Sequence, residues 1–143
     1  MITIKAISES ALPAIAEIEA ELFEKPLSLL ALRSMFDGQA FMGFISFENA
    51  SRAGYVLAHL TQDQAEILSL GTARQYQSRG HASLLLATLI STLRDTTCFL
   101  EVAVDNKAAR DLYTRNGFVE VGSRPGYYRR GQRSCDAVLM RRG

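Results

Sequence analysis

An apolar strand that leads through a short polar loop into a strongly amphipathic helix occupies the middle of this sequence. Residues 65–72 predict the strand, and beyond Gly80 apolar side chains recur at helical spacing, at positions 82, 85, 86, 89, 90 and 93. A helix with one apolar face buries that face against another layer, and the preceding strand belongs to a sheet that can provide it. The segment therefore predicts a layered α/β architecture.

The other segments alternate between the same two patterns. The polar turn at 48–52 predicts an antiparallel hairpin, and a long Gly- and Arg-rich connection is expected between the last two strands. In the first helix, which Ser8 or Ser10 is expected to cap, positions 15, 18 and 22 form the apolar face, and Glu17, Glu19 and Glu21 are expected mostly outside. We expect an α/β (α+β) fold with a mixed sheet, with further strands at 2–7, 41–47, 54–60, 98–104, 118–121 and 135–140 and further helices at 28–36 and 106–116.

Length and composition limit the classes of function. The chain has 143 residues with 48% hydrophobic and 22% charged positions, which predicts one domain over residues 1–143. A formal charge of +1 is low for a protein that wraps nucleic acid, although basic residues outnumber acidic ones after residue 106. With two cysteines, two histidines, no apolar run of about 20 residues and no evident secretory signal, we expect a cytoplasmic protein without a disulfide framework, a metal site or a membrane span.

The loop that precedes the central helix has the properties of a phosphate site. It reads Gln77-Ser78-Arg79-Gly80-His81-Ala82, and the helix begins within it. The unpaired N–H groups and partial positive charge of a helix N-terminus suit a pyrophosphate, and Gly80 lets oxygens approach the backbone closely. The loop lacks the lysine of a Walker motif, and a plain strand–turn–helix corner is the alternative reading.

Two later segments make a catalytic site more probable than a plain corner. Phe99-Leu100-Glu101-Val102 carries a carboxylate within an apolar strand, where glutamate is uncommon unless it is paired or functional. The following helix begins at Asn106, contains Tyr113 and stops at Gly117.

The order of these motifs resembles that of the GNAT acyl-CoA N-acetyltransferases. The resemblance rests on Gln-x-x-Gly-x-Ala after a strand, then Leu-Glu-Val, then Asn-x-x-Ala-x-x-Leu-Tyr-x-x-x-Gly-Phe, and it is most specific from about residue 65 to 140. Tyr127-Tyr128 followed by Asp136-Ala137 is similar to the ending of the RimI type, which acetylates the N-terminal alanine of a small-subunit ribosomal protein. The chain differs from that type at Lys25-Pro26-Leu27-Ser28, where the group commonly has Phe-Pro-Trp-Ser in a region that helps to shape the acceptor site.

The resemblance implies a fold and a set of roles. The sheet should be mostly antiparallel, with about seven strands, about four flanking helices and a splay at the acetyl-CoA site. Glu101 would be the general base, acting directly or through water, and Tyr113 the general acid. The alternative for Glu101 is a structural carboxylate, and the alternative for Tyr113 is an aromatic residue of the core. Tyr127 and Tyr128 would line the acceptor groove. Acetyl-CoA would contact the backbone of Leu70, Gly71 and Thr72 and the side chain of Tyr113. It would also contact the loop residues Gln77, Ser78, Arg79, Gly80, His81, Ala82 and Ser83. Asn106 would be a further contact, although it could equally be a helix cap.

The expected acceptor is a protein N-terminus, and the expected state is a monomer or weak dimer without direct nucleic-acid binding. Three alternatives stay open. They are a GNAT enzyme for a small amine such as a polyamine, amino acid or antibiotic, a non-catalytic acyl-CoA-binding module, and a nucleic-acid binder that uses the arginine-rich last third. Cys98 is expected to be a small buried residue rather than an acetylated nucleophile.

Overall fold

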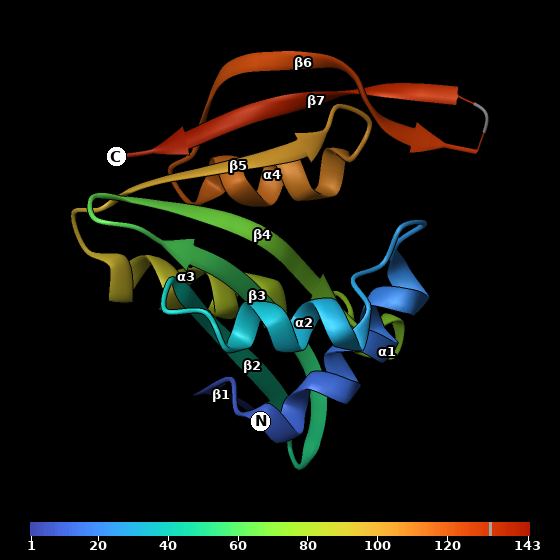
Figure 1. The fold of residues 1–143 in the computed structure, drawn as a ribbon, viewed down its shortest axis with the longest axis vertical. Helices are drawn as coiled ribbons and strands as arrows, with labels where there is room; N and C mark the ends of the chain where they lie inside the picture. Colours follow the sequence, from blue (N-terminus) through green and yellow to red (C-terminus); the bar gives the residue numbers. More distant parts are fainter. Residues whose placement is uncertain (132) are drawn as a thin grey trace.

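The computed structural model describes residues 1–131 and 133–143, and its described strands form one seven-stranded sheet in the order β1-β2-β3-β4-β5-β7-β6 (Figure 1). The only parallel neighbours are β4 and β5, so the predicted mixed, mostly antiparallel sheet is confirmed. The strands are β1 (Ile2–Ala6), β2 (Phe41–Glu48), β3 (Ser51–Leu60), β4 (Gln64–Thr72), β5 (Thr97–Ala103), β6 (Val119–Arg130) and β7 (Arg133–Arg142). The α-helices are α1 (Leu12–Leu22), α2 (Leu29–Phe36), α3 (His81–Leu93) and α4 (Lys107–Arg115), with short 3-10 turns at Glu9–Ala11 and Arg74–Tyr76.

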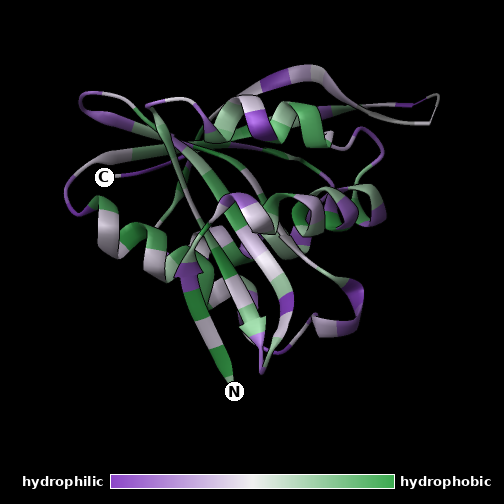
Figure 2. Cartoon of the chain, turned by 60° about the horizontal axis from the view of Figure 1, so that its bottom comes forward, coloured by the Kyte–Doolittle hydropathy of each residue, from purple (hydrophilic) through white to green (hydrophobic). Residues whose placement is uncertain are grey.

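Helices cover both faces of the sheet because the central strands are apolar on both sides. Along β3, Val56 and Ala58 pack in the cluster that contains the apolar faces of α3 and α4. Tyr55 and Leu57 point the other way and pack with α1 and α2, as the two-residue period of a strand requires. Figure 2 shows the hydropathy of the residues along the strands and helices of the chain.

The sheet opens where its two parallel strands separate. β4 and β5 pair from Gln64 with Thr97 to Ile67 with Leu100, and the described pairing stops there. On its other side β4 stays paired with β3 up to Thr72. The divergence of the two strands is visible in Figure 1. Residues 68–72 therefore offer a backbone edge on the β5 side, and the predicted splay is confirmed.

The sequence predicted most of the elements, and three details differ. Strand β6 reaches Arg130, so residues 122–130 lie in a strand where a connection was expected. β6 is an edge strand, and its pairing with β7 shifts register between Arg124 and Tyr128, which accommodates Pro125. Ser8 precedes the 3-10 turn without capping it by its side chain, whereas Ser28 does cap α2 by accepting from the Ala31 N–H at 3.1 Å. Glu19 is buried rather than outside.

No described helix is long and apolar enough to cross a membrane.

Candidate active site

The N-terminus of α3 is open to an approaching anion. Gly80 is the residue before the helix and has φ 102°, and an added Cβ there would have no atom within 4 Å. No side chain of the described residues caps the helix by a hydrogen bond. The first N–H groups of a helix have no partner within it, so this end keeps donors available for the oxygens of a pyrophosphate.

The loop side chains mainly shape the loop. The Gln77 side-chain amide donates to the Thr72 carbonyl at 3.0 Å, which closes the turn. Arg79 is half exposed, lies above the Tyr76 ring with 5.7 Å from its guanidinium carbon to the ring centroid, and has its Nη1 3.9 Å from a Glu48 oxygen. Ser78 and Ser83 are exposed, and Ala82 is partly buried against the core.

His81 faces away from the loop opening, into the sheet. Its imidazole is 1% exposed and lies between Ser46 Oγ, 2.8 Å from Nδ1, and Glu48 Oε1, 2.7 Å from Nε2. The hydrogen bond from His81 is the largest influence on the pKa of Glu48 and lowers it, burial opposes this, and Arg79 adds to the lowering. The imidazole thus ties the first residue of α3 to β2.

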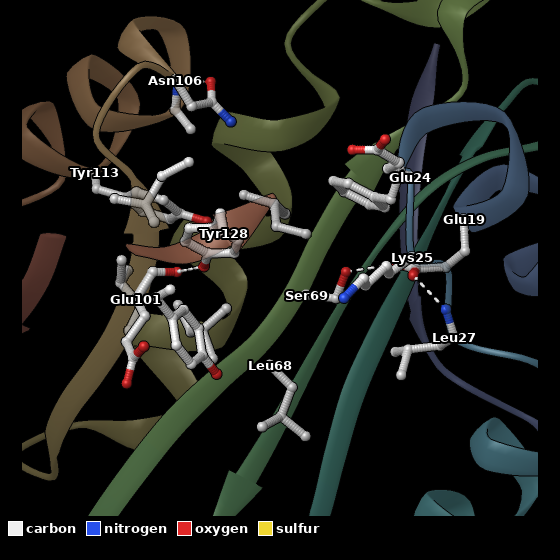
Figure 3. A pocket seen from close by; sticks show the side chains of 18 of the residues that line it. Glu19, Glu24, Lys25, Leu27, Leu68, Ser69, Glu101, Asn106, Tyr113 and Tyr128 are labelled. Carbon is white, nitrogen blue, oxygen red and sulfur yellow. Dashed lines mark hydrogen bonds between the residues drawn. The ribbon is translucent and has the colours of Figure 1, made fainter. Parts of the chain in front are cut away.

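A cavity of about 520 Å³ lies where β4 and β5 diverge. Figure 3 shows Glu101, Tyr113, Tyr128 and Asn106 on one side of β4, and Glu19, Glu24, Lys25 and Leu27 on the other. The predicted residues that line it are Leu70, Glu101, Asn106, Tyr113, Tyr127 and Tyr128. The loop 77–83 and the residues Gly71 and Thr72 lie outside the lining of this cavity.

Glu101 has one paired and one unpaired carboxylate oxygen. Its Oε1 is 2.9 Å from Nη2 of Arg124 on β6. Its Oε2 is buried and has no hydrogen-bond partner among the described residues. A buried polar atom without a partner costs free energy, and such atoms in folded proteins call for an explanation. Oε2 therefore keeps acceptor capacity that no described residue uses.

Tyr113 brings a buried hydroxyl to the same cavity. Burial is the main influence on its pKa and raises it, with smaller contributions from Tyr128 and Cys98, so the phenol stays protonated at any physiological pH. Its hydroxyl is therefore present as a hydrogen-bond donor. Cys98 is buried, as expected, and burial raises the pKa of its thiol to about 11, which disfavours the thiolate that a nucleophile needs.

Three of the other predicted residues make contacts that stabilise the site. The Tyr128 hydroxyl donates to the carbonyl of Glu101 at 3.1 Å, and the Tyr127 and Tyr128 rings meet edge to face with centroids 5.0 Å apart. The Asn106 side chain accepts from the Ala109 N–H at 3.2 Å, so it caps α4 as well as lining the cavity.

Comparison with known proteins decides the family. Residues 12–118 match the acetyltransferase (GNAT) family. The chain belongs to that family. As a GNAT chain it is 30% identical over 143 positions to the [ribosomal protein bS18]-alanine N-acetyltransferase of Escherichia coli K12, covering 98% of this chain and 96% of that protein. It is 32% identical over 151 positions to the N-alpha-acetyltransferase RimI of Mycobacterium tuberculosis, covering 99% and 92%.

The fold of this GNAT chain agrees with its sequence. It superposes on the crystal structure of the ribosomal-protein-S18-alanine N-acetyltransferase from Escherichia coli with a TM-score of 0.93, covering 99% of this chain and 93% of that one. The chain is thus a GNAT N-acetyltransferase of the RimI type, as the sequence motifs predicted. The family implies acetyl-CoA as the donor, and both the open N-terminus of α3 and the free edge of β4 at residues 68–72 fit such a ligand.

Sequence reasoning missed three residues of the cavity region. Glu19 and Ser69 line the cavity, and Arg124 pairs with Glu101. For Glu19 a signal existed, because position 19 lies one turn after Ile15 and beside Ile18 on the buried face of α1. Nothing local distinguishes Arg124 from the other arginines of the last third.

Proposed function

We propose that this enzyme transfers an acetyl group from acetyl-CoA to the N-terminal α-amine of a protein, with Glu101 as general base and Tyr113 as general acid. The observation that carries the proposal is the cavity between β4 and β5, which both Glu101 and Tyr113 line. One carboxylate oxygen of Glu101 is buried without a hydrogen-bond partner among the described residues, and the buried phenol of Tyr113 stays protonated. We further propose that the acceptor is a small-subunit ribosomal protein that begins with alanine and that the reaction takes place in the cytoplasm. The similarity over nearly the whole chain to a protein named for that acceptor supports this assignment.

The base has a clear task. A peptide α-amine has a pKa of about 8, so most of it is protonated at pH 7 and must lose a proton before it can attack. Arg124 holds Oε1 of Glu101 and so orients the carboxylate, while Oε2 receives the proton directly or through a water molecule. The amine nitrogen then forms a bond to the thioester carbon that acetyl-CoA supplies.

The leaving thiolate and the carbonyl oxygen need donors. The Tyr113 hydroxyl gives its proton to the sulfur as the carbon–sulfur bond breaks. A backbone N–H of residues 70–72, on the free edge of β4, donates to the oxygen on which negative charge develops. Gly80 and the first residues of α3 hold the pyrophosphate through backbone N–H groups, with the side chains of Ser78, Arg79 and His81 secondary.

Two of the three glutamates that line the cavity already accept hydrogen bonds within the protein, which does not favour a polyamine as acceptor. Both oxygens of Glu19 accept hydrogen bonds within the protein, and Oε1 of Glu24 accepts from the Gly131 N–H at 3.0 Å. Both oxygens of Glu19 and one oxygen of Glu24 are thus taken by internal donors, which leaves fewer acceptors for a cationic chain. A small-amine acetyltransferase is therefore the second candidate, and the experiment below includes it.

The test is an acceptor panel with the purified protein and acetyl-CoA. The panel contains peptides that begin with Ala-Arg, Ser or Met, an N-blocked lysine peptide and spermidine, and mass spectrometry locates the acetyl group. We expect acetylation at free α-amines, and we expect Glu101→Gln to lower kcat/KM by about 100-fold or more, in the range of general-base contributions. The matched control is Glu66→Gln, an exposed carboxylate on β4, which should leave the rate unchanged.

Two outcomes would contradict the proposal. Acetylation of spermidine alone would assign the enzyme to small amines. A protein that binds acetyl-CoA but acetylates no acceptor in the panel, and whose affinity for acetyl-CoA is unchanged by Glu101→Gln, would be an acyl-CoA-binding module.

A further inference from the structure

A buried carboxylate joins three segments beside the cavity. Glu19, on the last turns of α1, is 2% exposed. Its Oε1 accepts from the Leu27 N–H at 2.9 Å, and its Oε2 accepts from the Ser69 hydroxyl at 2.5 Å and from the Tyr55 hydroxyl. Figure 3 shows the bonds of Glu19 to Ser69 and to Leu27. Burying a carboxylate is costly unless donors replace water, and here three donors do so.

The donors are themselves fixed by the fold. Tyr55 is fully buried on β3, and burial, followed by the charge of Glu19, raises the pKa of its hydroxyl, so it remains a donor at any physiological pH. The ring lies against Gly71 of β4, where an added Cβ would be 2.6 Å from the Tyr55 hydroxyl oxygen. A side chain at position 71 would therefore displace the hydroxyl that holds Glu19. Gly71 is needed for this contact.

The segment held by Glu19 forms one wall of the cavity. Residues 23–28 connect α1 to α2, and Phe23, Glu24, Lys25 and Leu27 line the cavity. Glu24, Lys25 and Leu27 lie across β4 from Glu101 (Figure 3). The two ends of the segment are fixed by the end of α1 and by the Ser28 cap of α2. The bond from the Leu27 N–H to Glu19 fixes the segment just before the Ser28 cap, and Glu19 in turn accepts from Ser69 of β4.

We infer that Glu19 is a positioning residue for the acceptor: its carboxylate, held by Tyr55 and Ser69, sets the position of the wall at residues 23–27 and thereby the affinity for the acceptor peptide. This inference rests on the proposed function. Glu19 acts from the acceptor side, because the segment that it holds lines the cavity across β4 from Glu101, whereas residues 77–83 at the start of α3 lie outside that lining (Figure 3). Its loss should therefore weaken acceptor binding and leave acetyl-CoA binding and the chemical step intact.

The experiment compares Glu19→Gln with Glu17→Gln, an exposed carboxylate of the same helix. A glutamine keeps the shape of the side chain, but its NH₂ group is a donor that faces donors from the protein where the carboxylate had an acceptor. We expect KM for an acceptor peptide to rise about tenfold or more, as for loss of a hydrogen bond to a charged group. We expect kcat and KM for acetyl-CoA to stay unchanged, and Glu17→Gln to behave as the wild type.

A second variant and a second measurement guard against misfolding. Tyr55→Phe removes one donor and keeps the packing, so it should give a smaller rise in acceptor KM, and combining it with Glu19→Gln should add little because the two residues share one contact. Amide hydrogen exchange at Leu27, measured without any acceptor, should be about tenfold faster in Glu19→Gln, since the N–H then bonds to a neutral amide oxygen, a weaker acceptor than a carboxylate, or faces the NH₂ group.

The outcomes separate this inference from the proposed function. An unchanged acceptor KM in a folded Glu19→Gln variant, an equal rise in both KM values, or a fall in kcat alone would each overturn the inference while the wild type remains an α-amine acetyltransferase. If instead the wild type acetylates no peptide, the proposed function fails. In that case, unchanged amide exchange at Leu27 would still contradict the inference that the hydrogen bond to Glu19 holds residues 23–27 in place.

Discussion

At the scale of single residues, His81 is the clearest case in which a buried side chain positions a binding loop, the start of α3, that its own atoms do not line. It is the first residue of α3, and its imidazole spans Ser46 and Glu48 of β2. His81→Leu would fill the space but leave the buried Ser46 hydroxyl without its partner, which costs about 1–3 kcal/mol. We expect KM for acetyl-CoA to rise with the acceptor KM unchanged, as measured by steady-state kinetics in both substrates.

The control for this prediction is the reciprocal variant. Glu19→Gln should change the acceptor KM alone, so the two variants should show opposite patterns. A His81→Leu enzyme that is folded and has an unchanged KM for acetyl-CoA would show that the bridge to β2 does not hold the loop.

At the scale of elements, the approach to α3 depends on the backbone of Gly80. Its φ of 102° lies in the left-handed region, which costs an L-residue roughly 1–2 kcal/mol, although a Cβ would meet no atom there. We expect Gly80→Ala to weaken acetyl-CoA binding by shifting the loop, as measured by calorimetric titration with CoA. Gly122→Ala on β6 is the matched control, because its Cβ also meets no atom and its φ is ordinary. Equal affinities in the two variants would contradict the argument.

At the scale of the whole molecule, two buried tyrosines couple stability to alkaline pH. Burial raises the pKa of both Tyr55 and Tyr113, so the folded state holds their protons more tightly than the unfolded chain. Their contribution to stability is fully present below about pH 10, the value of a free tyrosine, and is lost as the pH rises above it. Each should lower the free energy of unfolding by about 1.4 kcal/mol per pH unit in that range.

Urea unfolding at a series of pH values from 8 to about 11 measures this slope. Tyr55→Phe removes one of the two groups, so the variant should lose less stability over this range than the wild type. Identical slopes in the two proteins would show that Tyr55 ionises in the folded state as readily as in the unfolded chain.

The local signals of the sequence determined a large part of this protein. The apolar spacing after Gly80 predicted α3, the Ser28 and Asn106 caps were both readable, and Gln-x-x-Gly-x-Ala with Leu-Glu-Val indicated the family. Each cap and each spacing depends on residues within about one or two turns of each other, and the order of such short motifs along the chain indicates the family. Backbone geometry and capping chemistry are local, so the amino acids alone specify them.

Only the tertiary structure decided how distant residues meet. The length of β6 follows from its pairing with β7, because backbone hydrogen bonds to β7 keep the segment extended. Its glycines and proline, taken alone, predict a loop there. The same pairing brings Arg124 to Glu101, and the close approach of Tyr55 to Gly71 brings a hydroxyl to Glu19. Each contact joins segments that are far apart in the chain, and its partners are chosen by strand register and by packing, which no local pattern encodes.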